Sequence, residues 1–455
     1  MSVDLTARPA KQARLIRLHR LLPKLMRDPV NGLAEIGMAT GGEIVRLDLG
    51  PFRPYLVTHP DHVQHVMKGN WSNYLRKGMF WRPLERLLGN SILGEGPGWD
   101  SSRKILQPLF TARYVAALSE DLADTINEGF EALRPHEKSG EPIDAGVEMA
   151  RVVNKAVIKV LFGSRISDPD AERVAPAYTT AATSIAFRML FPSAPYSIRV
   201  PGDRRFLASI KTIEEVMFPV IEQARRERSE GKDIVSALCQ ARDEQGAEIS
   251  IQQMRDDLVS IYGAASETTG MALTWLWPML GENPEVEAKL REEIDRVVGR
   301  DPVRPSHLPH LTYTKMVLQE LLRLYPSGWM LPRLVGTAEE LGGVRIKAGS
   351  QVLISPYATH RLESFWDRPL TFDPERFSPE NQERRHRYAY FPFGGGPHLC
   401  LGQHLFYIEA PLMVAAILSR YRPVIVNPGP FKPLPAPSVR PSRKVEMALL
   451  PIERA

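Results

Sequence analysis

The chain has 455 residues, of which 43% are hydrophobic and 24% are charged, an ordinary composition for a globular protein with a large core. The formal net charge of +5 is too small to indicate a nucleic-acid partner. The only cysteines, Cys239 and Cys400, exclude an extensive disulfide framework and favour a reduced, cytoplasmic setting. No apolar run reaches about 18 residues, so no membrane span is predicted.

Basic and apolar residues alternate at helical spacing over residues 11–26 (KQARLIRLHRLLPKLM). We expect a helix packed on the protein body there, and the alternative is a helix lying on a membrane surface. The next predicted segments are a β-hairpin (43–50 with 54–58), a short helix (60–69) and an irregular apolar stretch (77–98). The irregular stretch is either a binding loop or a buried connection.

Between residues 99 and 325 the apolar residues recur with a helical period. The predicted helices span residues 100–110, 114–134, 145–163, 169–188, 204–229, 233–243, 252–282, 284–298 and 311–325. A hairpin (344–346 with 351–355), a proline-rich meander to residue 392, a last helix (405–418) and a strand (445–450) follow. Because no repeat or low-complexity linker interrupts the chain, we expect one domain over residues 1–455, mainly α with small β-sheets.

The loop at residues 393–402 (FGGGPHLCLG) delivers Cys400 just before the last predicted helix. Consecutive glycines allow the main chain to approach another body closely and leave N–H groups free to point at a thiolate. The alternative is a tight turn with Cys400 as an ordinary buried side chain.

The middle of the longest predicted helix reads AASETT over residues 264–269. Ala264 and Thr268 share one face of that helix, with Glu267 beside them. Alternatively, Thr268 only bonds its own i−4 carbonyl and Glu267 points to solvent. Two further helical pairs share a face: Trp99 with Arg103, and Glu320 with Arg323.

The spacing Phe-x-x-Gly-x-x-x-Cys-x-Gly, carried by Phe393, Gly396, Cys400 and Gly402, resembles the haem-binding loop of the cytochrome P-450 superfamily. The resemblance covers essentially the whole chain. It implies a fold with a large helical lobe and a smaller β-rich lobe, haem b (iron protoporphyrin IX) as cofactor, and Cys400 as the ligand of the iron.

Residues 264–269 resemble the oxygen-binding helix of the same family, which makes Thr268 and Glu267 the catalytic pair that delivers protons. Ala265 stands where the family has glycine. We expect the groove in this helix to survive, because Thr268 can draw the carbonyl of Ala264 and Gly263 is adjacent.

The resemblance assigns the remaining site residues by their motifs. The haem-binding set is Trp99, Arg103, Arg333, His398 and Phe393, the structural set is Glu320, Arg323 and Arg376, and the substrate pocket is Ala264, Met79, Phe80, Trp329, Met330 and Leu331. The basic run Arg384-Arg385-His386-Arg387, with Lys104, Arg113 and His404, is either a solvated charge run or a docking patch for an electron donor.

The implied activity is that of a haem-thiolate monooxygenase. It would use dioxygen to hydroxylate or epoxidise a lipophilic small molecule (a terpenoid, polyketide or fatty-acid-like compound), with electrons from NAD(P)H through a separate ferredoxin and ferredoxin reductase. The alternatives are a peroxide-driven hydroxylase, which would want an arginine near Ala264, and a haem-based gas sensor or carrier, which would need no proton relay.

Overall fold

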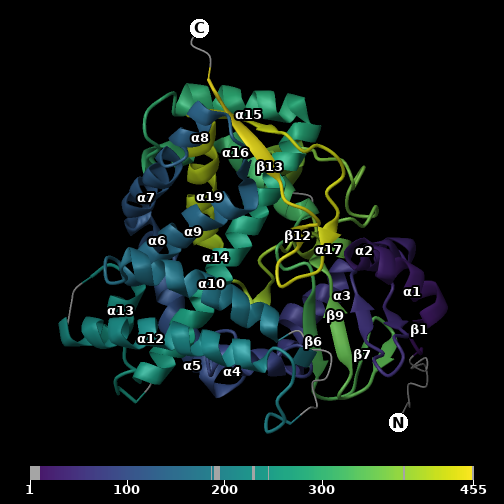
Figure 1. Cartoon of the computed structure of the whole chain (residues 1–455). Helices are drawn as coiled ribbons and strands as arrows, with labels where there is room; N and C mark the ends of the chain where they lie inside the picture. The colour runs from purple at the N-terminus through teal and green to yellow at the C-terminus, as the bar shows by residue number, and fades with distance from the viewer. Residues whose placement is uncertain are drawn as a thin grey trace.

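A computed structural model of the chain describes residues 11–185, 187–188, 195–227, 231–243, 245–382 and 385–452. Figure 1 shows the long helices gathered on one side and a smaller, sheet-rich part on the other, where the first strands and helices of the chain lie. The predicted mainly α architecture with small β-sheets is confirmed. Within the described residues, no helix is both long enough and apolar enough to cross a bilayer.

Most predicted helices form, with small shifts at their ends. The longer helices are α1 Leu18–Arg27, α2 Pro29–Ala39, α5 Pro97–Leu106, α7 Ser119–Glu131, α9 Ala145–Phe162, α10 Asp168–Ser184, α12 Asp203–Glu227, α14 Ile251–Glu282, α15 Pro284–Val297, α16 Thr312–Leu324 and α19 Gln403–Leu418. The shorter helices are α3 Pro60–Gln64, α4 Glu85–Leu88, α6 Ala112–Ala117, α8 Arg134–Ser139, α13 Ile234–Gln240, α17 Pro356–Thr359 and α18 Pro379–Gln382.

Helix α14 runs through the middle of the molecule (Figure 1). Its 32 residues give a length of roughly 48 Å at about 1.5 Å per residue. The Ser250 hydroxyl caps its start by accepting the N–H of Gln253. Helices α9, α12, α16 and α19 pack around it, so residues on all its sides are buried. This packing holds residues 264–269 at the centre of the fold.

The strands are β1 Arg14–Ile16, β2 Val45–Leu47, β3 Tyr55–Val57, β4 Tyr74–Leu75, β5 Ile143–Asp144, β6 Leu331–Val335, β7 Glu339–Leu341, β8 Val344–Ile346, β9 Gln351–Ile354, β10 Tyr421–Ile425, β11 Pro433–Leu434, β12 Arg440–Pro441 and β13 Glu446–Pro451. The largest sheet has the order β1-β2-β3-β9-β6-β4, so it joins strands from residues 14–75 to strands from residues 331–354. A second sheet has the order β10-β13-β5.

The first predicted hairpin is confirmed as the antiparallel pair β2–β3. The second, of residues 344–346 with 351–355, is wrong: β8 pairs with β7, and β9 lies between β3 and β6. Gly342 and Gly343 take φ values of 56° and 76°, which allow the tight turn that joins β7 to β8. Strand β9 is mostly buried, and a central position in the large sheet provides that burial.

Two predicted helices also differ from the structure. The segment predicted as a helix over residues 11–26 becomes helical only at Leu18, because β1 pairs in parallel with β2. The predicted helix 114–134 is divided between α6 and α7 near Leu118, where the Ser119 hydroxyl donates to the Ala116 carbonyl.

Candidate active site

One large cavity lies among α5, α14, β6 and the cysteine loop. Its empty volume is about 1550 Å³, with the open solvent at its mouth included. The wall contains Cys400, Thr268 and Ala264, together with many apolar side chains. Residues that are more than 130 positions apart in the sequence therefore meet around one space, as the motifs predicted.

The cysteine loop has the backbone that its glycines permit. Gly394 and Gly396 take φ values of 72° and 65°, and a Cβ on Gly396 would lie 1.8 Å from the Met67 carbonyl oxygen. The N–H of Cys400 donates to the Phe393 carbonyl at 3.0 Å, which closes the loop. Phe393 itself packs edge-on against the ring of Phe406 in α19.

The Cys400 thiol faces the cavity just before α19 begins. Burial raises the pKa of this thiol, while the N–H groups of Gly402 and Gln403 and the guanidinium of Arg103 lower it. The chain thus presents donors and a cation to the sulfur, and these groups favour a thiolate once a cation binds it.

Thr268 lies on the cavity face of α14. Its hydroxyl donates to the Ala264 carbonyl at 2.6 Å, so the expected interaction within this helix is confirmed. The helix continues without interruption past Ala265. The carbonyl of Thr268 accepts the hydroxyl of Ser327 at 2.9 Å, which ties the middle of α14 to the loop that follows α16.

Glu267 does not line the cavity. It lies 3.3 Å from the guanidinium of Arg440 in β12, a partner that the sequence analysis did not identify. Burial raises the pKa of Glu267, while Arg440 and the N–H of Ser438 lower it. No local signal marks Arg440, because the contact joins positions 173 residues apart.

Four of the predicted haem-binding residues, two of them arginines, lie together at one part of the cavity. Arg103 and Trp99 share the cavity face of α5, and Arg103 donates to the Leu399 carbonyl at 2.7 Å. The centroids of the Trp99 and His398 rings are 4.3 Å apart. Arg333 enters from β6, and burial lowers its pKa to about 10.

Arg76 is a third cation of the cavity wall, which the sequence analysis missed. Its Nε and Nη2 atoms are buried and find no hydrogen-bond partner in the described part of the chain. Its backbone N–H donates to Glu95 at 2.6 Å. Burial, with Arg333 nearby, lowers the pKa of Arg76 to about 9. Burial pushes the pKa of Glu95 upward, but His398 and Arg76 hold it at about 2.

These residues fit a flat, apolar molecule that carries carboxylates. Unpaired guanidinium nitrogens in a buried site require an anionic partner, because an isolated buried charge is costly. The apolar walls supply space for a macrocycle, and the thiol supplies a soft ligand for a metal. The chemistry of this donor set is therefore that of a haem site.

The predicted structural trio also comes together. Arg323 donates to both carboxylate oxygens of Glu320, at 2.7 and 2.8 Å, and both side chains are fully buried. Arg376 lies 3.5 Å from the same carboxylate. The N–H of Asp373 donates to Glu320 at 2.9 Å, so the pair is tied to the proline-rich meander.

The predicted substrate pocket is brought together only in part. Ala264 and Leu331 line the cavity. Trp329 instead packs in a core cluster behind it, with Met330 and Phe80 against that cluster, and Met79 also lies outside the wall. The irregular stretch still contributes to the cavity, through Trp81, Ile92 and Leu93. Side chains at neighbouring positions of an irregular loop point in different directions, and the composition of the loop does not indicate which of them face the cavity.

Two residues of the basic run at residues 384–387 contact the protein body. The guanidinium of Arg385 stacks over the ring of Trp366 at 4.3 Å. His386 lies 3.1 Å from Asp61. Arg387 is exposed, and Arg384 lies outside the described residues. Arg385 and His386 are therefore held by their neighbours, and a docking role of the run stays a prediction.

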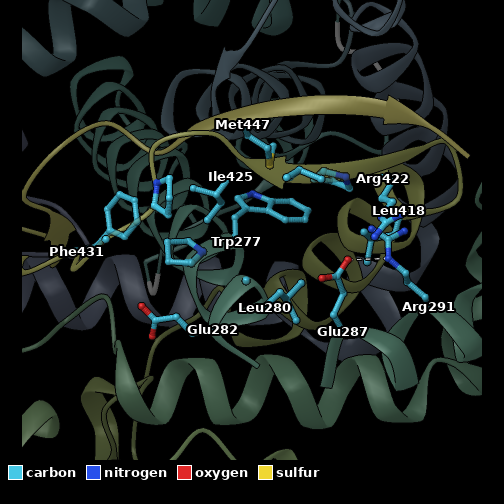
Figure 2. Close-up of a pocket in the computed structure, with 16 residues that line it drawn as sticks. Trp277, Leu280, Glu282, Glu287, Arg291, Leu418, Arg422, Ile425, Phe431 and Met447 are labelled. Carbon is cyan, nitrogen blue, oxygen red and sulfur yellow. Dashed lines mark hydrogen bonds and ion pairs between the residues drawn. The ribbon is translucent and has the colours of Figure 1, made fainter. Parts of the chain in front are cut away.

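A second cavity lies between the end of α14, α15 and β10 (Figure 2). Figure 2 shows the Trp277 indole at its centre, with Glu287 and Arg291 paired at one end. Of the described residues that line it, none also lines the cysteine cavity. No cysteine is among the described residues that line this second cavity, so the cysteine cavity is the candidate active site.

Comparison with known proteins agrees with this geometry. The family model for Cytochrome P450 matches residues 34–448. The chain is 31% identical to Cyclooctatin synthase of Streptomyces melanosporofaciens, with 95% of this chain and 92% of the relative covered. It is 27% identical to Pentalenene oxygenase of Streptomyces avermitilis, with 94% of each chain covered. The solved haem domain of cytochrome P450DA superposes with a TM-score of 0.86 at 22% identity, over 98% of this chain and 99% of the other.

Proposed function

The chain belongs to the cytochrome P450 family and is a haem-dependent monooxygenase, and we propose that Cys400 ligates the iron and that the substrate is a terpenoid. When bound, haem supplies the reductive activation of dioxygen and the transfer of one oxygen atom to a C–H bond or a double bond. Everything else in the proposal concerns what this chain's own residues do.

Several groups hold the sulfur and the carboxylates of the cofactor in place. The N–H groups of Gly402 and Gln403 point toward the Cys400 sulfur and favour its thiolate form. Arg76, Arg103 and Arg333 offer guanidinium groups to the carboxylates. Because these cations lie at one part of the cavity, they would hold the carboxylate edge of the cofactor there and so fix its orientation.

We assign proton delivery to Thr268 and Glu267. The Thr268 hydroxyl donates to Ala264, so its lone pairs stay free to accept a hydrogen bond from water in the cavity. Glu267 lies on the same helix outside the cavity wall, with a raised pKa that comes from burial. A carboxyl group with a raised pKa keeps its proton at a higher pH than an exposed carboxyl group does, and can then donate it.

The substrate assignment rests on the cavity wall and on the relatives. The wall beyond the cations is lined by apolar side chains, including Ile92, Leu93, Phe110 and Ile261. Such a surface selects a lipophilic molecule by burial of apolar area. One of the two relatives named above is by its name an oxygenase of pentalenene, a terpene hydrocarbon, so we prefer a terpenoid over a polyketide or a fatty acid.

The observation that carries the proposal is that Cys400, Thr268 and the unpaired nitrogens of Arg76 belong to one site. The test is the absorption spectrum of the purified, reduced protein with carbon monoxide. We expect a strongly red-shifted Soret band that Cys400→Ala abolishes. A protein that stays colourless with added haemin, or a red-shifted band that survives Cys400→Ala, would refute the assignment.

Terpenoids are then screened for a shift of the iron to high spin, which reports displacement of bound water. Saturable shifts with terpenoids, and none with fatty acids of similar size, support the substrate class. The opposite preference contradicts it without touching the assignment of Cys400.

We further propose a separate ferredoxin with its reductase as the electron donor. Lys104, Arg113 and His404 are exposed on α5, α6 and α19, near the cysteine loop. Turnover with a ferredoxin, its reductase and NADPH, compared with peroxide alone, tests this. Faster oxidation with peroxide would favour the peroxide-driven alternative.

A further inference from the structure

Helix α1 has one wide apolar sector, and only one edge of that sector is buried. At the inner edge, Leu21 is fully buried and Leu25 packs against the same core cluster. Toward the outer edge, Leu18, Leu22 and Met26 are 40%, 47% and 78% exposed. These three positions are four residues apart, so their side chains form one row along the helix. Packing against the protein explains the inner edge of the sector but does not explain why the outer row is apolar.

The exposed apolar residues of this segment form a group and are not isolated single residues. Leu15 in β1 precedes it and is 44% exposed. Isolated exposed apolar side chains are normal on a protein surface, whereas a continuous group marks an interaction site. Figure 1 shows α1 and β1 at the outer edge of the sheet-rich part, beside α2. The row therefore lies where a large, flat partner can reach it.

The charge of the same segment is entirely positive. No aspartate or glutamate occurs from residue 11 to residue 27, and the cations are Lys11, Arg14, Arg17, Arg20, Lys24 and Arg27. All six are exposed, and of the described residues only Glu35 forms an ion pair with them, at Lys24. A second copy of this surface would be repelled by so many like charges.

We propose that β1 and α1 bind reversibly to an anionic lipid bilayer. Leu18, Leu22 and Met26 enter the boundary between headgroups and acyl chains, and the arginines on the polar side of the segment attract the anionic headgroups. A helix with an apolar side and a polar side rich in basic residues is the usual form of an interfacial helix. Each basic residue near an anionic membrane strengthens binding roughly five-fold. The proposal stands apart from the assignment of the substrate.

The test is sedimentation of the full-length holoprotein with vesicles. One vesicle set contains phosphatidylcholine alone, and the other contains phosphatidylcholine and phosphatidylglycerol in equal parts. We expect binding to the second set only, and a marked loss at high salt because the phosphate contacts are screened. Absence of binding to both sets overturns the proposal, and so does equal binding to both.

Variants locate the contact. Leu22→Glu with Met26→Glu places two carboxylates in the row and should lower the partition coefficient at least roughly tenfold. Arg17→Gln with Arg20→Gln should lower it roughly twenty-fold. Leu370→Glu is the matched control, because Leu370 is 67% exposed elsewhere on the surface. It should bind like the wild type.

The haem spectrum and the melting temperature of each variant confirm that the fold is intact, as expected for changes at exposed positions. Wild-type binding by the Leu22→Glu, Met26→Glu variant refutes the proposal. A concentration-dependent dimer in sedimentation velocity that this variant abolishes also refutes it, since the occupant of the row would then be a second copy of the chain.

Discussion

Replacing Arg323 by alanine breaks the buried ion pair that ties α16 to the proline-rich meander. Both side chains of the Glu320–Arg323 pair are fully buried. Arg323 also donates to the carbonyls of His360, Pro369 and Thr371, at 2.9, 2.6 and 3.1 Å. The substitution therefore leaves a buried carboxylate with only Arg376 nearby, at 3.5 Å, and three carbonyls without that donor.

Breaking a buried pair by removing one partner costs about 3–5 kcal/mol, because the remaining charge stays in a poor solvent. Domains are usually stable by only about 5–15 kcal/mol, so much of the unfolding free energy is lost. We expect Arg323→Ala to yield little folded holoprotein, and any that forms to unfold at clearly lower urea. Urea titration followed by the haem absorbance measures this difference.

Arg134→Ala is the matched control. Arg134 and Glu131 form an ion pair with the same sequence spacing, at 2.9 Å, but their side chains are 59% and 49% exposed. An exposed pair contributes about 0–1 kcal/mol, so this variant should resemble the wild type. If Arg323→Ala lowers stability no more than Arg134→Ala does, the argument from burial is wrong.

Three further predictions concern the site. Thr268→Ala should keep its haem but divert reducing equivalents to peroxide. Thr274→Ala removes the same kind of i−4 hydrogen bond from α14 and should still use its reducing equivalents for product. Assays of peroxide and of product distinguish the two results. Arg76→Leu should speed transfer of haem to an acceptor protein about tenfold or more, because a charge-assisted hydrogen bond is lost. Glu409 in α19 also lines the cysteine cavity, and burial raises its pKa from 4.5 to about 8, so its folded form holds a proton that the unfolded chain releases. The contribution of this group to the unfolding free energy is present at low pH and falls as the pH rises from 4.5 toward 8. Glu409→Gln should therefore be more stable than the wild type at alkaline pH but not at acid pH. Urea titrations at several pH values measure this difference.

The sequence predicts well what depends on short-range patterns. The spacing of Ala264 and Thr268 predicted their shared face, and the structure brings both to the cavity. The glycines around Cys400 predicted a close approach of main chain, and Gly396 lies against the Met67 carbonyl. Such patterns act over one or two turns, where geometry follows directly from residue order.

Contacts that join distant segments were not predictable in the same way. Arg76 became a cavity cation because β4 pairs with β6, beside Arg333. Arg440 meets Glu267 because β11 and β12 return the chain to α14. The pairing of β8 with β7 also depends on β9 being drawn into the large sheet. In each case the tertiary arrangement decides, and a single sequence carries no local mark of it.

The strand order of the large sheet affects how the protein folds during its synthesis on the ribosome. Strand β3 emerges early, yet its neighbour β9 is made about 300 residues later. Until Gln351–Ile354 has left the exit tunnel, one edge of the early strands has no partner and is open to aggregation. The cysteine loop is translated later still, so cofactor capture must be among the last events of maturation, and chaperone demand should be highest just before it.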